Sequence, residues 1–137
     1  MDITYIPEDK IDLVWSGVAP MLKKALDLNH GRYHMDDVYN GLLKGTYQLW
    51  IIYKNYGNVL AAVVTEVVTY PRKKSLLVFL AGGQEHTLWV GPLLETLKSC
   101  AKALGCDFVE SFARIGWQKS LQKLGIKPRH QIYEIIV

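Results

Sequence analysis

Residues 47 to 81 read YQLWIIYKNYGNVLAAVVTEVVTYPRKKSLLVFLA, and this stretch decides the class of fold. Aromatic and β-branched residues, which favour strands, are concentrated in three runs within it. The runs are Tyr47 to Tyr53, Val59 to Thr69 and Ser75 to Ala81. Two clusters of turn-forming residues separate them, Asn55 to Asn58 and Tyr70 to Lys73. Because such short turns join neighbouring strands that run in opposite directions, the stretch predicts an antiparallel meander of three strands.

Upstream of the meander, the apolar residues recur with a helical period. Ile3 to Ile6 alternates weakly and predicts an edge strand. A helix is expected over residues 8 to 28, with a kink or break at Pro20, which cannot donate a backbone hydrogen bond. A second, shorter helix is expected from Met35 to Leu43, because Gly45 is typical of a helix end.

Downstream of the meander, helix and strand patterns alternate. Apolar residues between Trp89 and Leu104 predict a long helix with Pro92 in its first turn. Asp107 to Ala113 indicates a strand that runs parallel to its neighbour, because a helix leads into it. A short helix from Trp117 to Leu124 and a strand from His130 to Val137 follow. The order β-α-α-β-β-β-α-β-α-β predicts a single-domain α/β fold with a mixed sheet.

Composition places residues 1–137 in one globular domain. The chain has the length of one ordinary domain, and 50% of its residues are hydrophobic, which excludes a disordered or low-complexity chain. It contains no uncharged apolar stretch of about 18 residues, the length that suggests a membrane span. Met1 to Thr4 does not begin a secretory signal, so we expect a cytoplasmic location.

The net charge, the cysteines and the histidines indicate neither a nucleic-acid-binding surface nor a disulfide nor a metal site. A net charge of +3 with a pI near 8.8 is only mildly basic, so nucleic-acid binding is not favoured. Cys100 and Cys106 are expected to be free thiols. His30 and His34 are four residues apart, but Gly31 lies between them, and we expect no metal site.

Residues 47 to 125 resemble the GNAT-type N-acetyltransferase fold in their order of elements. Lys123-Leu124-Gly125-Ile126 is similar to the lysine-leucine-glycine-aromatic signature that ends the family's fourth helix, with Ile126 in place of the aromatic residue. Further segments look like those of the small acetyltransferase-like proteins of tailed phages and prophages. These segments are Tyr70 to Lys74, Leu80 to Gly83, Gly105 to Asp107 and Arg114 to Trp117. The resemblance implies a GNAT-like fold and acetyl-CoA as the cofactor.

In that family, the pyrophosphate of acyl-CoA lies between the third long strand and the next helix, where backbone N–H groups hold its oxygens. The resemblance therefore implies cofactor contacts from Leu80, Ala81, Gly82, Gly83, Gln84, His86 and Trp89. The usual pattern has small residues where this chain has Thr87 and Trp89, and Glu85 would repel phosphate. Gly82 and Gly83 fit either an anion-binding nest or a simple turn.

The resemblance also implies catalytic roles. Glu66 and Glu110 are the carboxylates near the sheet, and each is a candidate base or an outward-facing residue. The tyrosine that often protonates the leaving thiolate corresponds to Leu121, which cannot donate a proton.

Two functions remain open from the sequence. The first is a weak or degenerate acyl-CoA-dependent N-acetyltransferase that acts on an unidentified amine. The second is a non-catalytic GNAT-fold protein of phage type, which serves as a virion structural or assembly component or as an interaction module. Its partners would be other proteins, virion proteins among them, and it would lie in the host cytoplasm or the virion. An oligomer is compatible with both. A groove at Leu80 to Trp89 that admits pantetheine would favour the first function, and a groove filled by Trp89 or His86 would favour the second.

Overall fold

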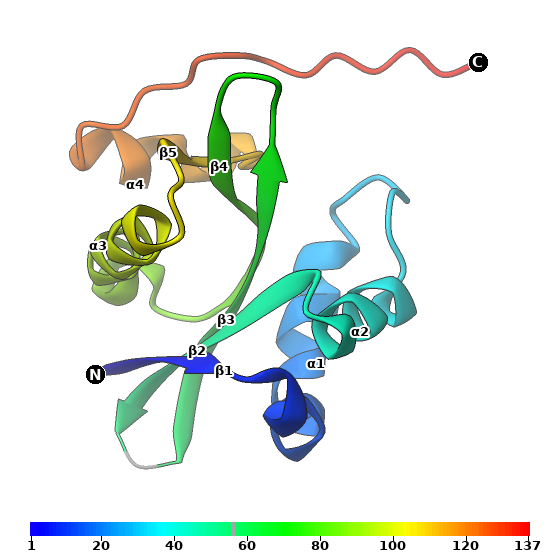
Figure 1. Cartoon of the computed structure of the whole chain (residues 1–137), viewed down its shortest axis with the longest axis vertical. Coiled ribbons are helices and arrows are strands. Elements are labelled where there is room, and N and C mark those ends of the chain that lie inside the picture. Colours follow the sequence, from blue (N-terminus) through cyan, green and yellow to red (C-terminus); the bar gives the residue numbers. More distant parts are fainter. Residues whose placement is uncertain (56) are drawn as a thin grey trace.

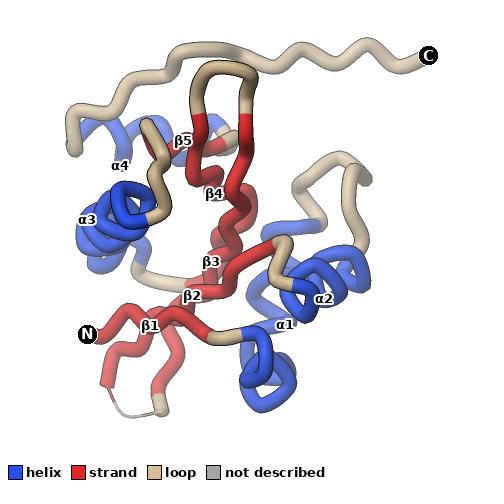
Figure 2. Tube along the Cα trace, in the orientation of Figure 1, coloured by secondary structure: helices blue, strands red, loops and turns tan. Residues whose placement is uncertain are grey.

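The computed structural model describes residues 1–55 and 57–137 and contains a five-stranded sheet (Figures 1 and 2). The strands lie side by side in chain order: β1 (Asp2–Ile6), β2 (Tyr47–Asn55), β3 (Asn58–Thr69), β4 (Lys74–Gly83) and β5 (Phe108–Ser111). Neighbours from β1 to β4 are antiparallel, and β4 and β5 are parallel. The predicted α/β class, the meander and the mixed sheet are confirmed. The turn predicted between β2 and β3 includes Tyr56, which lies outside the described residues.

Helices cover both faces of the sheet (Figure 1). α1 (Ile11–Leu26) and α2 (Met35–Lys44) lie on one face, and α3 (His86–Ala103) and α4 (Gln118–Lys123) lie on the other. Short 3-10 turns, η1 (Glu8–Lys10) and η2 (Ile115–Trp117), lead into α1 and α4. No helix among the described residues is long and apolar enough to cross a membrane.

β3 is buried on both faces, and this explains its nearly continuous apolar sequence. Ala61 and Val63 pack into the core under α3, whereas Ala62 and Val64 pack into the core under α1 and α2. Successive side chains of a strand point to opposite faces, so one strand contributes to both cores. β3 is therefore the central strand of the sheet and contributes to both hydrophobic cores.

β4 and β5 separate part-way along their length. β5 pairs with β4 only from Ser75 to Val78, and β4 continues to Gly83 without it. At the same point the register with β3 shifts: Val64 pairs with Leu80 and Thr65 pairs with Val78, which leaves Phe79 as an extra residue in β4. A bulge of this kind bends a strand and increases its twist. The bulge thus lies where the two strands part.

The two glycines at the end of β4 allow close packing. A Cβ on Gly82 would lie 2.3 Å from the carbonyl oxygen of Met21 in α1, and a Cβ on Gly83 would lie 2.3 Å from the carbonyl oxygen of Leu60 in β3. Gly82 also pairs with Ala62 across the sheet. Both glycines thus belong to the sheet, where they let α1 and β3 approach the backbone of β4.

Two details of the predicted helices differ from the structure. α1 runs from Ile11 to Leu26 through Pro20, so the break that is one of the two expectations there is wrong, and the kink stays a prediction. α3 begins at His86, not near Trp89, because Glu85 takes a left-handed conformation (φ 54°) and turns the chain directly into the helix. Pro92 consequently lies beyond the first turn.

The predicted final strand, His130 to Val137, is wrong. Residues 126–137 are all described and carry no helix or strand, and they run past the turn between β3 and β4 (Figure 2). Ile135 and Ile136 are each 88% exposed. A strand needs a partner for its backbone groups, and an apolar pattern alone does not supply one.

Candidate functional site

A groove lies where β4 and β5 separate, and it encloses about 130 Å³. This is roughly ten times the smallest space that holds one water molecule, so it can accept a chain of several heavy atoms. Its walls are mainly apolar. The lining residues are Ala25, Leu28, Asn29, Val78, Phe79, Leu80, Ala81, Trp89, Val90, Leu93, Leu94, Ser111, Phe112, Ala113, Arg114, Trp117 and Leu121.

The groove reaches elements on both faces of the sheet. Ala25 and Leu28 come from α1 and the turn after it, on one face, whereas Trp89 and Leu93 come from α3, on the other face. Such a passage requires a gap in the sheet, and the parting of β4 from β5 after Val78 provides it. A ligand in the groove could therefore meet a second ligand that enters from the opposite face.

Two indole rings form the wall on the α3 side. Trp89 is only 1% exposed, and its Nε1 donates a hydrogen bond to the carbonyl oxygen of Gln84 over 2.8 Å. The ring centroid of Trp117 lies 5.9 Å away. Leu121 of α4 also lines the groove, so the position that the GNAT resemblance assigns to the tyrosine lies at the site but carries an alkyl side chain.

His86 links α3 to α4 beside this wall. Its Nε2 lies 2.9 Å from the hydroxyl oxygen of Ser120, and its ring meets Trp117 edge-on with centroids 5.0 Å apart. The side chain of His86 is therefore held at the start of α3, next to the groove.

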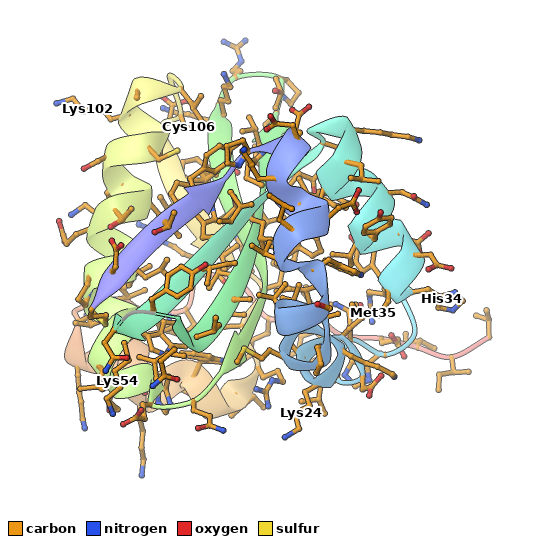
Figure 3. All side chains as sticks on the ribbon, turned by 90° about the horizontal axis from the view of Figure 1, so that it is seen from below. Lys24, His34, Met35, Lys54, Lys102 and Cys106 are labelled. Atoms are coloured by element: carbon orange, nitrogen blue, oxygen red, sulfur yellow. The ribbon has the colours of Figure 1, made fainter. Side chains whose placement is uncertain are left out.

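The start of α3 carries charge of both signs. Glu85 precedes the helix and makes no capping hydrogen bond with its side chain, and its carboxylate lies 3.6 Å from Nζ of Lys54. Lys54 is found at the same end of the molecule as the start of α3, opposite Lys102 and Cys106 (Figure 3). Helix N-termini favour anions, so Glu85 competes with any phosphate that binds there, whereas Lys54 attracts one.

The residues implied to contact the cofactor divide into three groups. Leu80, Ala81 and Trp89 line the groove. Gln84 and His86 make the hydrogen bonds that hold its wall. Gly82 and Gly83 pair with β3 inside the sheet and are not among the lining residues.

Glu66 and Glu110 lie on the same face of the sheet, on either side of Leu77. The register pairs Leu77 with both, and paired residues project to the same face. Neither carboxylate lines the groove. Burial raises the pKa of Glu66 above its usual value. The hydroxyl of Tyr70 donates to Glu110 over 2.7 Å, and this hydrogen bond is the main cause that raises the pKa of Tyr70.

Asn29 and Arg114 line the groove, although the sequence pointed to neither as a binding residue. Oδ1 of Asn29 is buried and has no hydrogen-bond partner among the described residues. The sequence identifies Asn29 only as part of a turn. It identifies Arg114 as part of a segment of phage-like resemblance and of a basic cluster with Lys119, Lys123, Lys127 and Arg129, which could meet phosphates or form a solvated face. Asn29 and Arg114 reach the same groove only through the tertiary structure, and no local sequence pattern predicts such an arrangement.

No group of three or more histidine, cysteine, aspartate or glutamate side chains in the described part of the chain is arranged to hold a metal ion. Cys100 and Cys106 are free thiols, as expected.

Solved structures share this fold along almost the whole chain. A probable acetyltransferase superposes with a TM-score of 0.74 at 13% identity, covering 100% of this chain and 98% of its own. A GCN5-related N-acetyltransferase from Ralstonia eutropha gives 0.68 at 19% identity, covering 98% and 97% of the two chains. A predicted acetyltransferase from Clostridium acetobutylicum, crystallised with acetyl-CoA, gives 0.69 at 12% identity, covering 98% and 95%. The chain has the GNAT-type fold.

At the level of sequence, neither the protein-family models nor the curated proteins contain a match to this chain. The structural likeness therefore establishes the fold, and function has to be argued from the groove.

Proposed function

We propose that the protein is a weak acyl-CoA-dependent N-acetyltransferase that acts on a small amine. The observation that carries the proposal is the groove between β4 and β5, which is lined by apolar side chains and reaches elements on both faces of the sheet. An acyl donor and an amine that enter from opposite faces would meet inside the sheet, and holding two reactants in this way accelerates their reaction.

The groove fits acetyl-CoA in its apolar part. The walls formed by Leu93, Trp117 and Leu121 suit a thin pantetheine arm. The first turn of α3 and Lys54 would hold phosphate oxygens, once the ion pair of Lys54 with Glu85 opens. The carboxylate of Glu85 opposes this anion, so we expect weak binding. Acetyl-CoA supplies the activated thioester.

The reaction forms a bond between the amine nitrogen and the acyl carbon and breaks the carbon–sulfur bond. The amine must lose a proton, and Glu66 is the proposed acceptor, through water, because its burial raises its pKa toward the range of a useful base. Glu110 is less suited to this role, since it already accepts a hydrogen bond from Tyr70. Leu121 cannot protonate the leaving thiolate, which must take a proton from water, and this slows the reaction.

Acetyl-CoA binding and thiol release test the proposal. We expect acetyl-CoA to raise the unfolding temperature at micromolar to millimolar concentration, and a panel of amines to release CoA thiol slowly in its presence. Glu66→Gln should reduce thiol release while acetyl-CoA still binds. An unfolding temperature that stays constant up to millimolar acetyl-CoA, with no thiol release from any amine, would overturn the proposal.

A second candidate function is a non-catalytic GNAT-fold protein of phage type, acting as a virion or assembly component. The alkyl side chain of Leu121 in the groove and the carboxylate of Glu85 at the start of α3 favour it. This function predicts stoichiometric binding to another protein without acetyl transfer. Detection of an acetylated amine at a rate that depends on enzyme concentration would exclude it.

A further inference from the structure

The polar groups of the groove are few, and one of them lacks a partner. Oδ1 of Asn29 is buried and accepts no hydrogen bond from any described residue. Asn29 is itself one of the residues that line the groove. A buried acceptor without a donor is unfavourable, and most such atoms in folded proteins are paired. A ligand N–H group would satisfy it once the side-chain amide turns toward the groove.

The backbone of Asn29 is held by two hydrogen bonds. Its N–H donates to the carbonyl oxygen of Leu26 over 2.9 Å, and its carbonyl oxygen accepts from Nη1 of Arg32 over 3.3 Å. The chain then turns sharply through His30 and Gly31, both with positive φ. The amide group is therefore presented from an anchored turn at the end of α1.

Arg114 is the only charged residue that lines the groove among the described residues, and no carboxylate lines it. Arg114 makes none of the ion pairs found in the described part of the chain. Its backbone is held, because its carbonyl oxygen accepts a hydrogen bond from the N–H of Trp117 over 3.0 Å. Guanidinium groups bind carboxylates and phosphates in bidentate geometry. The groove thus suits an anionic group and lacks the carboxylates that a polycationic amine would need.

We propose that the acceptor is a small aminocarboxylate of the α-amino-acid class, held between Asn29 and Arg114. The inference rests on the proposed function, because it names the substrate of the same groove. Oδ1 of Asn29 accepts a hydrogen bond from the neutral amine, and Arg114 binds the carboxylate. Leu28 and Phe112 offer apolar contacts, so an amino acid with an apolar side chain fits best. Asn29 takes no proton: the proton that the amine loses goes to the base.

Matched ligands separate the two contacts. Leucine carries both groups, leucinamide lacks the carboxylate, 4-methylpentanoate lacks the amine, and spermidine is a polycation. Binding is measured by calorimetry to the full chain, alone and with CoA present, and transfer is measured by thiol release with acetyl-CoA. Leucine should bind at least about tenfold more tightly than the other three. Tighter binding of spermidine or leucinamide would overturn the inference.

Variants assign the contacts to residues. Asn29→Ala and Arg114→Gln should each weaken leucine binding about tenfold, and Arg114→Gln should remove the preference for leucine over leucinamide. Asn29→Leu, which has a similar size and removes the acceptor oxygen, serves as a second variant if Asn29→Ala does not fold. Lys119→Gln, an exposed basic residue of α4 outside the groove, is the control and should leave binding unchanged.

The affinity for acetyl-CoA is measured separately for each variant. If Arg114→Gln weakens acetyl-CoA binding and leaves leucine binding unchanged, Arg114 serves the phosphates of the donor and the inference is wrong. If acetyl-CoA does not bind at all but leucine binds in a manner that needs Asn29 and Arg114, the proposed function fails and the ligand assignment stands. If neither ligand binds, both fail.

Discussion

Nε2 of His86 lies 2.9 Å from the hydroxyl oxygen of Ser120, and this contact joins the first residue of α3 to the middle of α4. Trp117 packs edge-on against the same imidazole ring and also lines the groove. Since α4 is a short helix that contributes one wall of the groove, a side-chain hydrogen bond to α3 has a direct effect on the shape of that wall.

His86 and Ser120 should be energetically coupled. Each single change, His86→Ala or Ser120→Ala, removes the hydrogen bond, so the double variant should lose less free energy of unfolding than the sum of the two. We expect a coupling of about 0.5–1.5 kcal/mol, toward the lower end because the pair is accessible to water. Denaturant unfolding of the four proteins measures it. Ser99→Ala, on the exposed face of α3, is the control. If the losses of unfolding free energy caused by His86→Ala and Ser120→Ala simply add in the double variant, the contact contributes nothing.

Position 82 should not tolerate a side chain, whereas position 17 should tolerate one. A Cβ at position 82 would lie 2.3 Å from a backbone oxygen of α1, and backbone cannot move away cheaply, so Gly82→Ala should cost about 1–3 kcal/mol or more. Gly17 lies within α1, and a Cβ added there would meet no atom of the described residues within 4 Å outside its own helical turn, so Gly17→Ala should stabilise by roughly 0.5–1 kcal/mol. Urea unfolding compares them. Equal stabilities would contradict the close approach of α1 to β4.

Much of this packing could be predicted from the sequence, because β3 and its neighbours are continuous apolar runs and the helices have a clear period. The final strand could not be predicted correctly, because the pattern of Ile132 to Ile136 does not reveal whether a sheet edge is within reach. The start of α3 could not be predicted correctly either, because it is decided by the left-handed conformation of Glu85. Within the candidate site, the position of Leu121 follows from its distance to Gly125. The convergence of Asn29 and Arg114 on the groove cannot be predicted from the sequence, because the two residues are far apart in the chain.

The stability of the protein should depend on the ionisation of Glu66. Burial raises the pKa of this carboxyl in the folded state above its value in the unfolded chain, so the folded state binds the proton more tightly. The resulting stabilisation is present below the unfolded pKa and is lost as the pH rises through the folded pKa. Glu66→Gln should therefore be more stable than the parent at pH 7, and this advantage should shrink toward pH 4.

The size of the Glu66 effect should be less than about 1 kcal/mol, because water screens a carboxylate that is only partly buried. Thermal unfolding of parent and variant from pH 4 to pH 8 measures it. Glu95→Gln, on the exposed face of α3, is the matched control and should show little change across this range. The quantity to compare is the stability of Glu66→Gln minus that of the parent. If this difference is smaller at pH 7 than at pH 4, the pH dependence has the opposite sign and burial is excluded as its cause.

Leu121 offers a gain-of-function test of the proposed chemistry. It lines the groove on α4 at the position where the GNAT resemblance places a tyrosine, and its alkyl side chain gives the leaving thiolate no proton. Leu121→Tyr adds a phenol at this point. A well-placed general acid contributes about 10²–10⁴ in rate, and we expect about a tenfold increase in thiol release, because the surrounding residues have not been shaped for the phenol. Leu121→Phe is the control, since it adds the same ring without the hydroxyl. If both variants release thiol at the same rate, proton donation at position 121 does not limit the reaction, and the alkyl side chain of Leu121 ceases to be a reason for weak activity.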